Sequence, residues 1–328
     1  ALMSIFYRQR FILGALLVTI ALALIPMVQT LQKNEYRGIV PAYVDDDLYY
    51  YGRIKEVADA NPFIGNSYFI EHRDARAVAF FVADWIAAVP LFFGVPFSLA
   101  IVLNFVVWAS VFVFLVYRIG RAMDISLPYS ALIGIVAFCE VYWLMLRPVV
   151  MQQVFPFFLL FLLALFQWLR DPLNQRSRVF LVIASALSFY VYTYLWQIVV
   201  AILGIVFLHR IFQKQWAEAK GLLEVVAGVG LLALPAIAYT VYQIGDPLYW
   251  ETVKRIGLLE SHLPSIDVYL YGRWIVAVTI LYTCVRKWIA IPKSTTFAVV
   301  MYSGIGLLII SLSNVITGKD VATAEHVG

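Results

Sequence analysis

The chain contains few charged residues and few of the side chains that usually carry metal or disulfide chemistry. Of its 328 residues, 13% are charged, four are histidines and two are cysteines. Because Cys139 and Cys284 both fall within apolar segments, we expect small buried hydrophobes and no disulfide framework. The sequence also lacks a His-Glu-x-x-His helix, a Gly-x-x-x-x-Gly-Lys loop and a Gly-x-Ser-x-Gly turn. Zinc proteases, P-loop nucleotidases and serine hydrolases with these motifs are therefore excluded, and we expect no nucleic-acid partner.

Hydrophobic residues, by contrast, make up 63% of the chain, and the mean hydropathy is +0.85. A soluble protein does not need so much apolar surface, so the composition predicts an all-α, polytopic bundle of membrane-spanning helices. The segment 179–209 is too long for one span, and we expect it to break near 192–197, because Tyr and Trp favour the membrane interface. Apolar runs of the ~20 residues that a span requires occur at 11–31, 98–117, 127–146, 149–169, 221–243, 266–285 and 295–313.

The apolar run 78–95 could either cross the membrane or lie along it. It is short, contains Asp84 and ends in Pro90, Gly94 and Pro96. If it lies along the outer interface, the chain has about nine spans and most basic residues fall on the cytoplasmic side, as the positive-inside rule requires. The short outer loops then keep only Arg147, Lys254, Arg255 and Lys319. We therefore predict about nine spans, a cytoplasmic N-terminus, a large first outer loop and an interfacial helix.

Residues 1–328 are expected to form a single integral membrane domain, in which 32–97 supply the outer loop and the interfacial helix. The run 11–31 is too long for the apolar region of a cleaved signal peptide and lacks a small-residue cleavage site, which predicts an uncleaved anchor helix. The chain begins at Ala1, and the stretch 319–328 shows no pattern of a closing helix. We therefore expect a piece of a longer protein, truncated at its C-terminus.

Carboxylates concentrate in the first outer loop, where Asp45, Asp46 and Asp47 follow one another. Asp47 is expected to cap a helix that runs to about Ala60. Three adjacent carboxylates repel one another, which favours a bound cation or a role in proton transfer. All three are candidate catalytic residues, and Asp45 and Asp47 are candidate ligands for a divalent cation such as Mg²⁺ or Mn²⁺. A purely structural capping role stays open.

A second acidic group closes the same loop and supplies candidate substrate-binding residues: Glu71, His72 and Asp74. The group either forms a solvated turn or assists acid–base chemistry. Because it shares a loop and a predicted membrane face with the aspartates, we expect the two acidic groups to lie within one outer cavity.

Four residues on other predicted outer segments are further candidates for substrate binding. Arg147 and Arg255 are rare outer cations beside an acid-rich site, which suits a phosphate or diphosphate group, unless each simply pairs with a nearby carboxylate. Trp196 could stack on a sugar ring or belong to an interfacial aromatic belt. His262 follows Arg255 in the same outer loop.

The layout of the chain resembles the GT-C superfamily of membrane glycosyltransferases, which use lipid-phosphate-linked sugars. The resemblance rests on a cytoplasmic N-terminus, one helix, an outer loop that opens with aspartates, an interfacial helix ending near Phe93-Gly94, and a polytopic bundle. It implies that acidic residues of the first outer loop act as catalytic base or metal ligands, positions that Asp45, Asp46 and Asp47 occupy here. Three aspartates stand where many members have an Asp-Glu pair or a single Asp.

We therefore expect a glycosyltransferase embedded in the bilayer, with its active face outward and a polyprenyl-phosphate-linked sugar as donor. One alternative is a transporter or flippase of lipid-linked saccharides, which would need ionisable residues at mid-membrane; Asp84, Glu224 and Arg273 are the candidates. Another is a non-catalytic subunit of a membrane complex, for which the acidic loop would be a docking surface. Loss of transfer on alanine substitution of the aspartates, with intact folding, would favour the enzyme.

Overall fold

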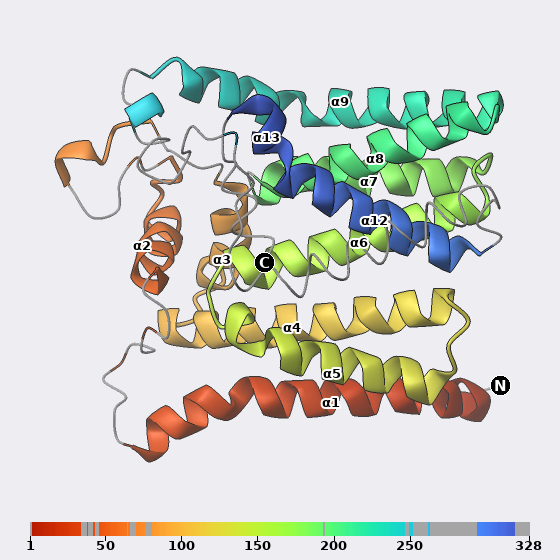
Figure 1. The fold of residues 1–328 in the computed structure, drawn as a ribbon. Helices are drawn as coiled ribbons and strands as arrows, with labels where there is room; N and C mark the ends of the chain where they lie inside the picture. Colours follow the sequence, from red (N-terminus) through yellow and green to blue (C-terminus); the bar gives the residue numbers. More distant parts are fainter. Residues whose placement is uncertain are drawn as a thin grey trace. The chain divides into compact units, whose positions relative to one another are not determined.

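A computed structural model of the chain describes residues 2–33, 38, 42, 46–63, 65, 70–76, 81–192, 194–246, 249–251, 262 and 294–318. These residues form twelve helices, one of them a short 3₁₀ helix, and no strand, which confirms the all-α class for this part of the chain (Figure 1). Within the described residues, six helical segments are long and apolar enough to cross a membrane: Gln9–Gln32, Phe97–Ala122, Leu127–Met145, Val150–Arg170, Leu195–Phe212 and Trp216–Ile244. They support a multi-pass membrane protein, and the finer count of nine spans stays a prediction.

The chain divides into two compact units, 1–163 and 164–328, and each is described by itself. The boundary falls within helix α6 (Val150–Arg170). The expectation of a single integral membrane domain over 1–328 stays a prediction.

The core of the first unit is a group of long helices: α1 (Leu2–Gln32), α4 (Phe97–Ala122) and α5 (Leu127–Met145). They pack side by side through a buried cluster to which Ala15, Phe105 and Phe138 belong (Figure 1). Close approach of α4 and α5 depends on Gly134, because a Cβ there would lie 3.1 Å from the Val113 carbonyl oxygen. Small residues that let two helix backbones approach closely are typical of helix interfaces within membranes.

Two short helices lie at the end of this unit where α1 ends and α4 begins (Figure 1). Helix α2 (Asp47–Ala58) packs on α3 (Val82–Phe92) through a cluster that includes Ile54, Ala83 and Ala87. At 1.5 Å per residue, α3 is about 16 Å long, roughly half of the ~30 Å hydrocarbon core, so it is too short to cross. The length agrees with the prediction that the run 78–95 does not span. The 3₁₀ helix η1 (Ile70–His72) stands between them in the chain.

The second unit contains α7 (Gln175–Val191), α8 (Leu195–Phe212), α9 (Trp216–Ile244), α12 (Thr295–Ser311) and α13 (Ser313–Thr317). The predicted break within 179–209 is confirmed, because α7 ends before Tyr192, whose backbone is extended. Arg178 pairs with Glu224 at 2.7 Å, which joins the start of α7 to the first part of α9. Arg210 at the end of α8 lies 3.2 Å from Glu218 at the start of α9. The predicted span 266–285 lies outside the described residues.

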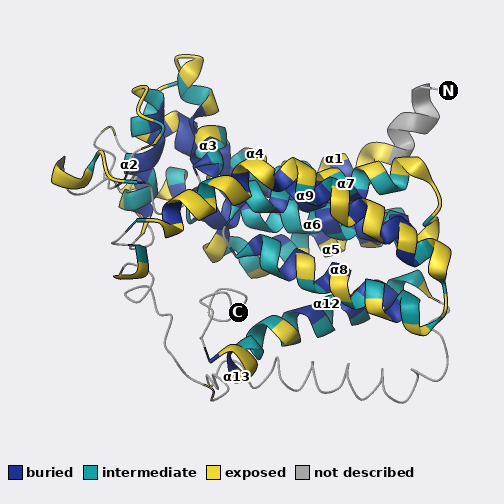
Figure 2. Ribbon diagram, turned by 90° about the horizontal axis from the view of Figure 1, so that it is seen from above, coloured by how far each residue is buried: buried dark blue, intermediate teal, exposed yellow. Residues whose placement is uncertain are grey.

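Apolar side chains remain exposed along the long helices of both units (Figure 2). On α5, Leu132 is 53% and Val136 is 60% exposed, and on α9 Leu231 is 68% exposed. Water would penalise such surfaces, whereas lipid chains solvate them. The exposed faces therefore agree with association of both units with a bilayer.

Candidate functional site

The acidic start of α2 differs from the expected cap. Asp46, not Asp47, occupies the N-cap position, and its side chain caps no backbone N–H. Asp47 is the first residue of the helix and is fully buried. The capping role predicted for Asp47 is therefore wrong; α2 also ends at Ala58, slightly before the expected Ala60. The Asp46 carboxylate, which is 54% exposed, forms an ion pair with Arg147 in place of a hydrogen bond to a backbone N–H. This pairing fixes Asp46 at the helix start, so that Asp47 becomes the first helical residue.

Arg147 lies on the turn between α5 and α6 and contacts α2 from there. Its guanidinium pairs with Asp46 and lies over the ring of Tyr50, with 5.5 Å between the guanidinium carbon and the ring centroid. Burial raises the pKa of the Tyr50 hydroxyl, although Arg147 opposes the shift, so the phenol stays protonated. Among the described residues, the buried Nε–H of Arg147 has no hydrogen-bond partner. Buried donors in folded proteins are usually hydrogen-bonded, and ordered water or a bound group can supply the acceptor.

The turn that carries Arg147 is strained. Val149, two residues further on, has a φ of +67°, a left-handed conformation that is unfavourable for a β-branched side chain. Val149 is also buried, in the same cluster as Ile54 and Ala83. Strain of ~1–3 kcal/mol persists only where the surrounding packing enforces it, and such residues cluster at functional sites. The turn therefore presents Arg147 to α2 at a cost in backbone energy.

A buried ion pair joins α2 to α3. Nε and Nη2 of Arg53 lie 2.8 and 2.6 Å from the same oxygen of Asp84, Oδ2, and both side chains are only 4% exposed. Arg53 Nη1 also donates to the Tyr49 hydroxyl at 3.0 Å. Burial raises the pKa of Asp84, and Arg53 opposes that shift; burial disfavours the charge of Arg53, yet Asp84 raises its pKa above the ordinary value.

The pairing of Arg53 with Asp84 is a feature that the sequence analysis missed. A lone acid within an apolar run was the only signal for it, because an ionised side chain in such a run requires a counter-charge. The transporter alternative needs ionisable side chains at mid-membrane, and its candidates are Asp84, Glu224 and Arg273, of which Arg273 lies outside the described residues. In the structure Asp84 is paired with Arg53, and Glu224 with Arg178.

Side-chain amides of two long helices hold α3 through its backbone. Gln153 of α6 donates to the carbonyl of Ala83 at 2.8 Å, and Asn104 of α4 donates to the carbonyl of Ala87 at 2.7 Å. Both amides are buried. Because a buried hydrogen bond is costly to break, these contacts fix α3 against α4 and α6 within the first unit.

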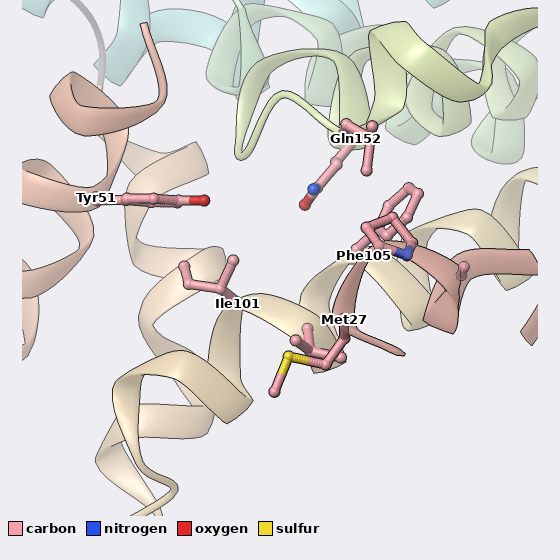
Figure 3. A pocket seen from close by; sticks show the side chains of 9 residues that line it. Met27, Tyr51, Ile101, Phe105 and Gln152 are labelled. Carbon is pink, nitrogen blue, oxygen red and sulfur yellow. The ribbon is translucent and has the colours of Figure 1, made fainter. Parts of the chain in front are cut away.

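A small cavity lies next to the Arg147 turn, between α1, α2, α4 and the start of α6. The Tyr51 hydroxyl and the Gln152 amide point into it from opposite sides, and Met27, Ile101 and Phe105 form apolar walls (Figure 3). Its volume of about 30 Å³ suffices for one or two water molecules and is too small for a prenyl chain. Leu146, which also lines it, directly precedes Arg147, so this mainly apolar cavity lies beside the site.

The second acidic group lies near the other end of α2. Glu71, His72 and Asp74 are exposed, and the turn that carries them is tied to α2 by Arg73, which pairs with Glu56 at 2.6 Å. Glu56 follows Asp47 by nine positions, which corresponds to about 13 Å along the helix. The structure thus brings Asp46 to Arg147 and brings the second group to the far end of α2. A shared cavity stays a prediction.

The remaining candidates fall in the second unit or outside the described residues. Trp196 stacks on Phe189 with ring centroids 5.3 Å apart, and exposed His262 has Nδ1 3.1 Å from the Val315 carbonyl oxygen. Asp45 and Arg255 lie outside the described residues. Within the part of the chain that the structure describes, no three His, Cys, Asp or Glu side chains are grouped to hold a metal ion. Because Asp45 lies outside the described residues, its predicted role as a metal ligand stays a prediction.

No protein-family model matches this sequence, and comparisons with curated proteins and with solved structures likewise find no match. The geometry around Asp46 and Arg147 is therefore the basis on which a function can be inferred.

Proposed function

We propose that the protein is a membrane glycosyltransferase of GT-C type, which transfers a sugar from a polyprenyl-phosphate-linked donor to an acceptor on the outer face of the membrane. The observation that carries the proposal is the buried Nε–H of Arg147, which lies beside the Asp46 carboxylate and has no hydrogen-bond partner among the described residues. The reaction needs a cation for the leaving phosphate and a base for the acceptor hydroxyl. The two side chains supply these two groups at one place in the first unit.

In the proposed step, the acceptor oxygen forms a bond to the anomeric carbon of the sugar, and the bond from that carbon to the phosphate oxygen breaks. The proton of the acceptor hydroxyl passes to Asp46, a general base. The lipid phosphate leaves with the electron pair of the broken bond. Arg147 stabilises the charge on this phosphate through Nε and Nη donors, because charge-assisted hydrogen bonds are strong in a partly dehydrated site.

The ion pair between Arg147 and Asp46 sets the order of donor binding and proton transfer. A donor phosphate that reaches Arg147 competes with Asp46 for the guanidinium, so donor binding frees the carboxylate to accept a proton. The Tyr50 ring under the guanidinium keeps Arg147 in place as the partner changes. Where the site takes a divalent cation, Asp45 and Asp47 are the proposed ligands, and the ion would add positive charge beside the leaving phosphate.

The decisive substitution is Asp46→Asn. An amide keeps the size of the carboxylate but is not a base, so release of polyprenyl phosphate from a panel of radiolabelled polyprenyl-phosphate sugars should fall by about 10²–10⁴-fold. Thermal stability should stay near that of the parent, because Asp46 is half-exposed and Asn occupies an N-cap position as well as Asp does.

The matched control is Asp59→Asn at the other end of α2, an exposed acid paired with Lys55, which should keep the parent rate. A second variant, Asp47→Asn, tests whether the buried neighbour is the base instead. Transfer at the parent rate by Asp46→Asn, alone and combined with Asp45→Asn and Asp47→Asn, would rule out the aspartates as catalytic groups and leave the subunit and transporter alternatives.

A further inference from the structure

We propose that Arg53 and Asp84 are a positioning pair, which transmits the fixed position of α3 to α2 and so holds Asp46 opposite Arg147. The link to catalysis rests on the proposed function, whereas the link to the position of α2 does not. Each step of the connection is a contact between described residues of the first unit.

The first step is the attachment of α3 to the long helices. Gln153 and Asn104 reach α3 from α6 and α4 and bind two carbonyls one helical turn apart, those of Ala83 and Ala87. Asp84 directly follows Ala83, so its side chain leaves a stretch of backbone that is held on both sides. Its position is therefore set by the bundle and not by the outer loop.

The second step is the ion pair itself, whose energetics argue against a role in stability alone. Removing two charges from water is expensive, and well-packed apolar side chains in their place are often at least as stable. The pair is also incompletely satisfied: among the described residues, Asp84 Oδ1 and Gln153 Oε1 are buried acceptors without hydrogen-bond partners. The pair does fix the orientation of the Arg53 guanidinium relative to Asp84, because two N–H groups of Arg53 bind the same carboxylate oxygen.

The third step runs along α2 toward its acidic end. Arg53 donates to the hydroxyl of Tyr49, one turn nearer the N-terminus. The Tyr49 ring meets the Tyr50 ring edge-on, with centroids 5.3 Å apart, and the Tyr50 ring lies under Arg147. Arg147 in turn pairs with Asp46. A continuous series of contacts thus joins the buried pair to the proposed base.

The test replaces the whole pair with apolar side chains, as Arg53→Met with Asp84→Leu, in the full chain in lipid nanodiscs. Each single substitution would leave a buried, uncompensated charge and could fail to fold, whereas the double variant leaves none. Spin labels at Leu48→Cys on α2 and Trp143→Cys on α5 report the position of α2; both residues are exposed. Cys139 and Cys284 are replaced by serine beforehand, because Cys139 is exposed and not buried as its apolar segment predicted.

In the double variant, we expect the distance distribution between the labels to shift or broaden relative to the parent. We also expect kcat for sugar transfer to fall by about 10²-fold, the effect of a misplacement of roughly 1 Å, while KM for the donor changes much less. The split follows because Asp46 moves with α2, whereas Arg147 lies on the α5–α6 turn and loses only its contact with the Tyr50 ring. Loss of the exposed pair on the same helix, as Lys55→Gln with Asp59→Asn, is the matched control and should change neither measurement.

A folded double variant with the parent distance distribution would overturn the positioning role. A changed distribution with an unchanged kcat would overturn its link to catalysis. If the parent protein transfers no sugar, the proposed function fails, and the distance measurement still decides by itself whether the pair positions α2.

Discussion

Arg147 offers the sharpest test of the phosphate-binding part of the proposal. The perturbations are Arg147→Gln, which removes charge and donors, and Arg147→Lys, which keeps the charge but loses the planar donors and the stacking on Tyr50. A hydrogen bond to a charged group contributes about 1.5–3 kcal/mol, and each 1.4 kcal/mol corresponds to about tenfold in affinity. Arg147→Gln should therefore raise the donor KM by roughly 10- to 150-fold. Arg147→Lys should fall at the lower end of that range, about tenfold.

Stability should respond much less to the same substitutions. The partner of Arg147, Asp46, is 54% exposed, and ion pairs with such exposure contribute about 0–1 kcal/mol. The assay is the initial rate of transfer against donor concentration, with thermal unfolding in the same detergent measured in parallel. Arg178→Gln in the second unit is the matched control, because Arg178 also pairs with a half-exposed acid, Glu224. A donor KM that stays at the parent value in Arg147→Gln, together with a large loss of thermal stability, would refute the reasoning and make Arg147 a structural residue.

The remaining predictions concern three glycines. Gly306→Ala places a Cβ 2.5 Å from Cγ1 of the fully buried Ile202, so α12 must move away from α8 at a cost of about 1–3 kcal/mol. In Gly204→Ala the new Cβ meets no atom within 4 Å, and the substitution should raise helix stability by about 0.5–1 kcal/mol. Equal melting temperatures of the two variants, or a higher one for Gly306→Ala, would contradict the close packing of α12 on α8. Gly65→Ala places a Cβ 2.3 Å from the backbone oxygen of Ala75, which no side-chain rotation relieves. Limited proteolysis of residues 61–76 should be faster in that variant, and an unchanged digestion rate would count against the close approach.

Hydropathy alone was enough to predict where the long apolar helices lie, because it is a property of contiguous residues. The break near Tyr192 could be predicted for the same reason: a segment too long for one span, interrupted by interfacial aromatics, has few other solutions. The cap of α2 could not be predicted in this way. Asp46 and Asp47 are chemically equal candidates for a helix start, and what separates them is Arg147, 101 positions away in the chain.

The sequence by itself predicted an all-α, multi-pass membrane protein with a group of acids in its first long loop, because composition, run length and the order of charged residues are read directly along the chain. The outer placement of that loop stays a prediction. The tertiary structure decided which charges meet. Arg53 and Asp84 are 31 positions apart, and the apolar run around Asp84 indicates that a counter-charge is needed without indicating which one; only the packing of α2 on α3 removes both side chains from water and brings them together. The burial of the Arg147 Nε–H, which has no partner within the described part of the chain, likewise exists only once the turn that carries Arg147 has packed against α2. Pairing depends on distance and on solvent exclusion, and neither is set before the helices pack.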